Sequence, residues 1–375
     1  LILSVCDGLV LTVAGLGGEM FPTGAVTGLV GGPLLIWLLP RLRGSTPPGT
    51  EAAEGPGPRL SRPAPVLAAL AAALVVAGAV LLWVGRVPQG WAVLDAQSVA
   101  DFLPMRLPRL IAAAASGAAL ALAGAILQRL TANPLASPEV LGVSGGAALG
   151  YAAVVFAVAA PAALTLTLGA MAGGAVALAV LIAFTARRDM PAERVLLAGI
   201  AVSALASAVL SAMMAVGDAR AWAILAWLGG ATATVTMAGA LALAALAGAV
   251  WLAALSMRRW LGLLPLGPGV AGGVGMVLPR ARLALIGLAG VATGAATVVT
   301  GPLSFVGLIA PHLARRMGLA RPADHLTGSA LIGAGLMLAA DFGARMAGFP
   351  YELPLGLFAS LIGAPWLIWL MTRRR

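Results

Sequence analysis

Residues 106–150 read RLPRLIAAAASGAALALAGAILQRLTANPLASPEVLGVSGGAALG. Between Arg109 and Arg129 this stretch carries no charged side chain. The length of that uncharged run is close to the roughly 20 apolar residues that one helical bilayer crossing needs. The stretch therefore predicts a membrane-spanning helix, and uncharged runs of similar length recur along the rest of the chain.

The composition of the whole chain also indicates a membrane protein. Of the 375 residues, 61% are hydrophobic and 10% are charged, with a mean hydropathy of +1.02, whereas soluble domains carry about 25% charged residues. We predict an all-α polytopic membrane protein. Its ten expected spans lie at about 66–85, 108–128, 138–159, 162–185, 195–216, 235–257, 283–300, 302–314, 327–342 and 353–371.

Residue types that serve catalysis and metal binding are scarce. One cysteine excludes a disulfide framework, and two histidines leave little for a metal site, so we expect no metal and no directly bound cofactor. All 23 basic residues are arginine, and without lysine the chain has no Walker A loop to hydrolyse ATP. The arginines lie at the ends of apolar runs, which argues against a nucleic-acid partner.

The arginines also predict the orientation of the chain in the membrane. With residues 44–65 in the cytoplasm, all but five arginines fall on the cytoplasmic side, in agreement with the positive-inside rule. The C-terminus is then expected in the cytoplasm. The five arginines expected on the outer side are Arg86, Arg106, Arg109, Arg220 and Arg345.

The two ends of the chain resemble each other. Residues 22–43 read PTGAVTGLVGGPLLIWLLPRLR and residues 354–375 read PLGLFASLIGAPWLIWLMTRRR, with glycine, proline, tryptophan and arginine in register. We interpret residues 1–43 as the last membrane helix of a truncated first repeat. Residues 44–65, rich in proline and glycine, are then a cytoplasmic linker, and residues 66–375 form a complete ten-span repeat.

The outer arginines suggest a docking surface. Arg106 and Arg109 are three residues apart at the expected start of a span, so they would share one helical face. We predict that this pair docks an acidic partner, and the alternative is contact with lipid headgroups. Asp341 lies four residues before Arg345, which predicts a local ion pair. Acidic residues are otherwise almost absent from the spans, which argues against a proton-coupled secondary transporter.

Four motifs occur in the order found in a known family. They are the stretch 106–150, LLAGIAVSALASA at 196–208, GPLSFVGLIAPHLARRMG at 301–318 and ADFGARMAGFPYELPLGLFASLIGAPWLIWL at 340–370. Residues 60–375 thereby resemble the iron-siderophore and vitamin B12 permease subunits of type II ABC importers. The tandem pattern and the ending GAPWLIWL are most similar to the second half of fused ferric hydroxamate permeases.

This resemblance implies the fold and the partners. The fold would be the ten-helix half of an importer transmembrane domain, with one extra helix from a truncated first half. The partners would be a second permease half, a cytoplasmic ABC ATPase dimer that uses the ATP, a periplasmic or lipid-anchored siderophore-binding protein and the lipid of the bacterial cytoplasmic membrane. The implied cargo is a ferric hydroxamate, with vitamin B12, haem or a catecholate siderophore as alternatives.

The resemblance also implies site residues at both ends of the transport path. In relatives, arginines matching Arg106, Arg109 and Arg345 pair with glutamates of the binding protein. The ATPase would contact the loop 258–282, where relatives have a short helix with Gly, Ala and Gly at four-residue intervals. Here Pro268 replaces a commonly acidic residue, and the alternative is a plain cytoplasmic turn. The expected ATPase contacts are Arg258, Arg259, Gly267, Ala271 and Gly275.

The segment after the first quoted helix has two interpretations. The resemblance places it near the inner gate, where small residues allow close helix packing. The residues expected in this packing are Asn133, Pro134, Gly142, Ser144 and Gly145. Residues 142–145 also have the GxSG form of a serine protease nucleophile, for which His312 would be the base. Such short motifs recur by chance, so we favour packing, and we expect His312 to cap a helix or tether a loop.

Overall fold

The computed structural model describes residues 59–372 apart from 88–89, 187–191 and 216–217. The predicted helix at 1–43 and most of the predicted linker lie outside the described residues. The chain divides into two compact units. We call them the small unit, described within 139–228, and the large unit, described within 59–138 and 229–372.

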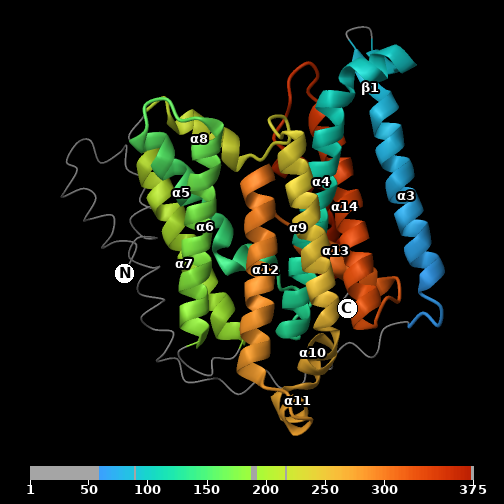
Figure 1. Ribbon diagram of the computed structural model, residues 1–375, viewed down its shortest axis with the longest axis vertical. Helices are drawn as coiled ribbons and strands as arrows, with labels where there is room; N and C mark the ends of the chain where they lie inside the picture. Colours follow the sequence, from blue (N-terminus) through green and yellow to red (C-terminus); the bar gives the residue numbers. More distant parts are fainter. Residues whose placement is uncertain (1–58, 88–89, 187–191, 216–217, 373–375) are drawn as a thin grey trace. The chain divides into compact units, whose positions relative to one another are not determined.

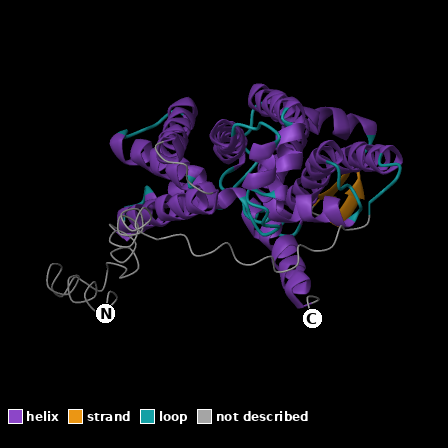
Figure 2. Ribbon diagram, turned by 90° about the horizontal axis from the view of Figure 1, so that it is seen from below, coloured by secondary structure: helices purple, strands orange, loops and turns teal. Residues whose placement is uncertain are grey.

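Helices dominate both units (Figures 1 and 2). The large unit contains α3 Ala64–Trp83, β1 Val84–Val87, β2 Gly90–Val93, α4 Ala96–Leu130, α9 Met237–Ser256, α10 Arg258–Leu263, η3 Leu264–Leu266, α11 Pro268–Gly273, α12 Leu278–Thr300, α13 Val306–Arg316, α14 Pro322–Met346 and α15 Leu355–Thr372. The small unit contains α5 Val143–Ala157, α6 Ala163–Ala186, α7 Ala192–Ala215 and α8 Ala221–Leu228, and the 3₁₀ helix η2 Pro138–Leu141 lies at the boundary.

The predicted all-α membrane architecture is confirmed. Each of the ten expected spans corresponds to one α-helix. Among the described residues, seven helices are long and apolar enough to cross a membrane, and α5 and α15 are shorter apolar helices. The sequence did not predict the short helix α8 or the two-stranded hairpin, in which Val84 pairs with Val93 and Val87 with Gly90.

Helix α4 begins earlier than the sequence predicted. The helix that contains the span expected at about 108–128 starts at Ala96 and continues through Pro104 and Pro108. Asp95 caps this start: its Oδ1 accepts a hydrogen bond from the backbone N–H of Ser98 at 3.0 Å. Several helical turns therefore precede the apolar part of α4, and both arginines of the RLPR motif lie inside the helix.

Helix α4 lies at the centre of the large unit. It contacts α9, α12, α13 and α14, and most of its residues from Leu110 onward are buried. Two glycines permit this packing. A Cβ atom added at Gly117 would lie 2.1 Å from the carbonyl oxygen of Gly333, and one added at Gly124 would lie 1.7 Å from that of Gly307. Backbone thus packs directly on backbone between α4 and both α13 and α14.

The small unit uses the same kind of contact. A Cβ atom at Gly150 of α5 would lie 2.0 Å from the carbonyl oxygen of Gly169 in α6, and one at Gly146 would lie 2.6 Å from that of Gly173. Tyr151 of α5 stacks on Trp227 of α8, with ring centroids 4.8 Å apart. Small residues therefore bring these helices together, and aromatic rings pack beside them.

The close approach of α4 and α14 predicts opposite effects for two glycines of one helix. Gly333→Ala should lower the thermal unfolding midpoint of the purified protein, because its Cβ would lie 2.4 Å from the carbonyl oxygen of Gly117. Overpacking of this kind costs about 1–3 kcal/mol.

Gly335→Ala is the matched control, two residues further along α14. A Cβ there has no neighbour within 4 Å, so alanine should leave the midpoint unchanged or raise it. Equal midpoints for the two variants would contradict the importance of backbone contact between α4 and α14.

Candidate docking site and coupling loop

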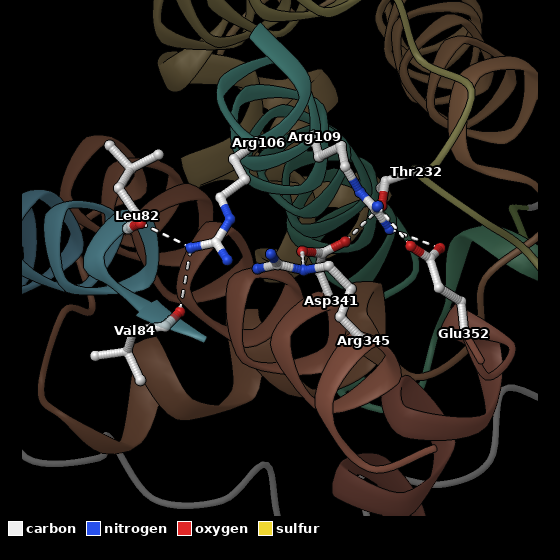
Figure 3. Close-up of polar contacts among 8 residues, drawn as sticks. All are labelled: Leu82, Val84, Arg106, Arg109, Thr232, Asp341, Arg345 and Glu352. Atoms are coloured by element: carbon white, nitrogen blue, oxygen red, sulfur yellow. Dashed lines mark hydrogen bonds and ion pairs between the residues drawn. The ribbon is translucent and has the colours of Figure 1, made fainter. Parts of the chain in front are cut away.

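Arginines and carboxylates gather at one end of the large unit (Figure 3). Arg106 and Arg109 come from α4, Asp341 and Arg345 from α14, and Glu352 from the loop between α14 and α15. We call these five residues the arginine cluster. The β1–β2 hairpin lies at this end, whereas α10 and α11 lie at the opposite end (Figure 1). The predicted docking and ATPase-contact residues of the large unit are therefore at opposite ends.

Arg109 is bound by a carboxylate of the same chain. Its Nη1 and Nη2 donate to Glu352 Oε1 and Oε2 at 2.6 and 2.7 Å, a bidentate geometry that is strong for this pair of groups. The side chain of Glu352 is 42% exposed, and that of Arg109 is 12% exposed. The hydrogen bonds from Arg109 lower the pKa of Glu352, so this carboxyl stays ionised to a lower pH than an ordinary glutamate.

Arg345 and Asp341 form the ion pair that the sequence predicted. Arg345 Nε lies 2.9 Å from Asp341 Oδ2, and the two side chains are only 6% and 1% exposed. The hydroxyl of Thr232 also donates to Asp341 Oδ1. Because removing one member of a buried ion pair leaves an uncompensated charge, loss of either side chain alone would destabilise the packing of α14. The guanidinium of Arg345 therefore has little exposure for a docking partner.

Arg106 has backbone partners. Its Nη1 donates to the carbonyl oxygens of Leu82 at 2.7 Å and Val84 at 3.4 Å. Leu82 belongs to the last turn of α3, where a cation satisfies unpaired carbonyls and interacts favourably with the helix dipole. No carboxylate of the described residues lies within 4.0 Å of this guanidinium. The arginine cluster thus has three cations and two carboxylates, and Arg106 carries the charge that has no counterion.

The other two arginines predicted to be outer are also held by the chain. Arg86 Nη1 donates to the carbonyl oxygen of Met346 at 3.2 Å. In the small unit, Arg220 Nη2 lies 2.5 Å from Asp218 Oδ2, and its Nη1 donates to the carbonyl oxygen of Phe156 at 3.0 Å. Both arginines therefore have a local structural role that needs no partner protein.

A second hydrogen-bond network, centred on Arg129 and buried His325, lies near the other end of α4. Arg129 donates from Nε to His325 Nδ1 at 3.1 Å, from Nη2 to the Ala320 carbonyl at 2.8 Å and from Nη1 to the Leu261 carbonyl at 3.4 Å. His325 is 0% exposed, and its Nε2 lies 2.9 Å from the carbonyl oxygen of Pro311. Since Nδ1 accepts from Arg129, Nε2 carries the proton and donates to Pro311.

Sequence reasoning missed this network and favoured the other histidine as a tether. His325 joins α14 to α13 and to Arg129 of α4, whereas His312 lies buried inside α13. Arg129 also donates to the carbonyl of Leu261 in α10, and α10 is the first element of the predicted coupling loop. Arg129 and His325 are 196 residues apart, so no local sequence pattern predicted their contact.

The predicted coupling loop contains a short helix, as expected. Helix α11 begins at Pro268, where the missing N–H of proline costs nothing. Gly267 and Gly275 flank it with φ of 95° and 83°, values that favour glycine, and Ala271 between them is 0% exposed. Arg258 and Arg259 are exposed at the start of α10, where they line an open hollow of about 380 Å³.

The residues predicted to pack near an inner gate divide between the two units. Asn133 and Pro134 lie in the turn after α4, where Asn133 Oδ1 accepts from the N–H of Leu135 at 2.9 Å. Gly142 caps α5 with φ of 77°. A Cβ atom there would lie 2.8 Å from the carbonyl oxygen of Gly199 in α7, and one at Gly145 would lie 3.0 Å from Ala206 Cβ. Ser144 lies between them in the first turn of α5.

Comparison with known proteins identifies the family. Residues 66–373 match the FecCD transport family. This chain belongs to the FecCD transport family. The match spans the ten helices that correspond to the expected spans, and it confirms the resemblance that the four sequence motifs indicated.

Individual members of the FecCD family extend this comparison. The iron(3+)-hydroxamate import system permease protein FhuB of Salmonella typhimurium is 41% identical over 374 residues, which cover 100% of this chain and 54% of the relative. The Fe(3+) dicitrate transport system permease protein FecC of Escherichia coli is 37% identical over 275 residues, covering 72% of this chain and 82% of the relative. The chain thus spans about half the length of the hydroxamate permease that it matches.

A solved structure supports the FecCD fold directly. It is assigned to the metal-chelate type of ABC transporter in an inward-facing conformation, and it is 29% identical with a TM-score of 0.75. The alignment covers 84% of this chain and 100% of that chain. The predicted fold, a ten-helix half of an importer transmembrane domain, is therefore confirmed.

The Arg129 network predicts a marked loss of stability when its centre is removed. Arg129→Met leaves the part-buried carbonyls of Leu261 and Ala320, and buried His325, without this donor, and an unsatisfied buried group costs about 1–3 kcal/mol. The thermal unfolding midpoint of the purified protein should fall by several degrees. Arg259→Met, at an exposed arginine, is the control, and an equal fall in both variants would show that the network contributes nothing specific.

Proposed function

We propose that this chain is a permease half of an ATP-driven importer that carries a ferric hydroxamate across the bacterial cytoplasmic membrane. The extent of similarity supports the hydroxamate class. The match to the hydroxamate permease covers 100% of this chain at 41% identity, whereas the match to the dicitrate permease covers 72% at 37%. The C-terminus lies in the cytoplasm in this proposal, as the distribution of arginines predicts.

The separation of two polar clusters by an apolar stretch of α4 supports a role in transport, with no chemical reaction on the cargo. The arginine cluster and the Arg129 network draw on residues toward opposite ends of α4. Between them, α4 is almost entirely apolar and packs through glycine contacts. The full importer then needs a second permease half to complete the path and a separate ATPase to supply the energy.

The ATPase would bind at the loop that contains α10 and α11. Arg258 and Arg259 are exposed there, and buried Ala271 holds α11 in place between two glycines. Through Arg129 and Leu261, this loop is tied to α4 and α14. Movement of the loop by the ATPase would therefore reach the central helices of the large unit through a hydrogen-bonded connection.

Uptake measurements test the energy source and the cargo together. In cells that carry the intact importer, uptake of radioactive iron as a hydroxamate complex should stop when the Walker A lysine of the ATPase is replaced. Gly267→Val should also reduce uptake, because a β-branched residue with φ near 95° is strained. Gly269→Ala is its control, since a Cβ there has no neighbour within 4 Å.

Other outcomes would identify a different transporter. Uptake that survives loss of the ATPase and stops with an uncoupler, while cellular ATP is held constant, would reject the ABC mechanism in favour of a proton-coupled carrier. Uptake of ferric dicitrate, haem or vitamin B12 in place of the hydroxamate complex would retain the mechanism and reject the proposed cargo.

The arginine cluster is the proposed docking site for the siderophore-binding protein. Arg106 provides a positive charge that has no counterion within the described part of the chain, and Arg109 provides a guanidinium beside the exposed loop of Glu352. Acidic side chains of the binding protein would pair with these groups. Exposed ion pairs of this kind steer association and set its register more than they add affinity.

Charge removal tests this docking site. Arg106→Gln combined with Arg109→Gln should weaken binding of the binding protein to the intact permease by roughly tenfold at low ionic strength, which corresponds to about 1.4 kcal/mol. The difference should shrink as salt is added. Arg220→Gln, which removes an arginine of the small unit that is paired with Asp218, is the control. Unchanged affinity in the double variant would reject the site.

A further inference from the structure

The bidentate contact between Arg109 and Glu352 occupies the part of Arg109 that a docking carboxylate would need. A guanidinium presents two edges with paired N–H donors, one between Nη1 and Nη2 and one that includes Nε. Glu352 engages Nη1 and Nη2 at 2.6 and 2.7 Å. Arg109 Nε is buried and has no hydrogen-bond partner. A second carboxylate therefore has no free, accessible edge on which to form the same bidentate contact.

Of the two ion pairs in the arginine cluster, only this one is open to exchange. Asp341 and Arg345 are 1% and 6% exposed, and Asp341 is held additionally by Thr232. Glu352 lies outside any helix, and its side chain is 42% exposed. Because Glu352 is partly exposed, a competing carboxylate can reach Arg109 and replace this contact with one of the same bidentate chemistry, so the exchange itself has a low net cost.

The backbone around Glu352 is fixed while its side chain is accessible. The N–H of Leu353 donates to the carbonyl of Ala344 at 3.0 Å, and that of Tyr351 donates to Gly348 at 2.9 Å. Two residues further on, the N–H of Leu355 donates to Gly230 at 3.1 Å. Release of Arg109 thus requires rotation of the glutamate side chain and no rearrangement of the loop.

We propose that Glu352 is an internal competitor at the docking site: it holds Arg109 in the free permease, and a carboxylate of the docking partner takes its place. This inference rests on the proposed function of the arginine cluster. The exchange replaces one bidentate carboxylate contact with another of the same chemistry, so the net gain in binding energy at Arg109 is small. Arg106, which lacks a counterion, then contributes new attraction, while Arg109 sets the register and allows ready release.

The experiment compares two carboxylate variants in the intact permease. Binding of the importer's own ferric-hydroxamate-binding protein to detergent-solubilised permease is measured at low ionic strength. Glu352→Gln should lower Kd by about two- to fivefold, because it weakens the internal contact without removing Arg109. Asp101→Asn is the matched control: it removes the same charge from an exposed position on α4 and forms no ion pair among the described residues, so Kd should change little.

A double-mutant cycle separates competition from a general charge effect. In the Arg109→Gln background, Glu352→Gln should leave Kd unchanged, since the contact for which it competes is gone. The thermal unfolding midpoint of each variant is measured in parallel. A Glu352→Gln variant that loses stability and binds the partner no better, or more weakly, would identify Glu352 as a purely structural partner and overturn the proposal.

The remaining outcomes distinguish failure of the Glu352 proposal from failure of the proposed docking function on which it rests. If Arg109→Gln weakens binding while Glu352→Gln leaves Kd at the wild-type value, docking through Arg109 stands and the competitor is rejected. If neither Arg106→Gln nor Arg109→Gln changes Kd, the docking site itself is rejected, and the competitor with it. An equal gain in affinity from Glu352→Gln and Asp101→Asn would assign the effect to net charge and also reject the competitor.

Discussion

Direct contact between helix backbones at glycine is the constraint on which the large unit depends. Helix α4 packs against α9, α12, α13 and α14, and at Gly117 and Gly124 the carbonyl groups of its neighbours occupy the space that a side chain would fill. In a membrane the hydrophobic effect gives helices little reason to associate, so close van der Waals packing has to supply the attraction. The many glycines and alanines of the sequence are therefore a requirement of assembly.

This apolar packing leaves charged groups toward the ends of the large unit, and the chain pairs several of the least exposed ones internally. Arg345 pairs with Asp341, Arg109 with Glu352, and Arg129 with His325 and two carbonyls. Arg106 alone in the arginine cluster relies on helix-end carbonyls. A permease that meets its partner proteins transiently benefits from such pairs, because each arginine remains stabilised when the partner has left.

The Arg129 network and the arginine cluster give the two ends of α4 different mechanical properties. The network centres on buried His325 and joins α4, α10 and α14, together with the carbonyls of Ala320 and Pro311. Several hydrogen bonds thus connect the helices at this end of α4. The contact of Glu352 with Arg109 is partly exposed, and its partners can exchange. Connected helices near the proposed ATPase site would transmit movement of the coupling loop. An exchangeable contact at the proposed docking site would let the binding protein bind and leave.

The sequence by itself determined the ten helices, the FecCD family and the Asp341–Arg345 pair, because hydropathy, motif order and spacing along one helix are local properties. The tertiary structure decided that Arg109 meets Glu352, 243 residues away, and that Arg129 meets His325, 196 residues away. It also decided the early start of α4 and the β1–β2 hairpin. Such pairings depend on which elements pack against each other. Helices with alanine and glycine on every face carry no sequence pattern that shows which faces will meet, so the pairings become visible only in the packed structure.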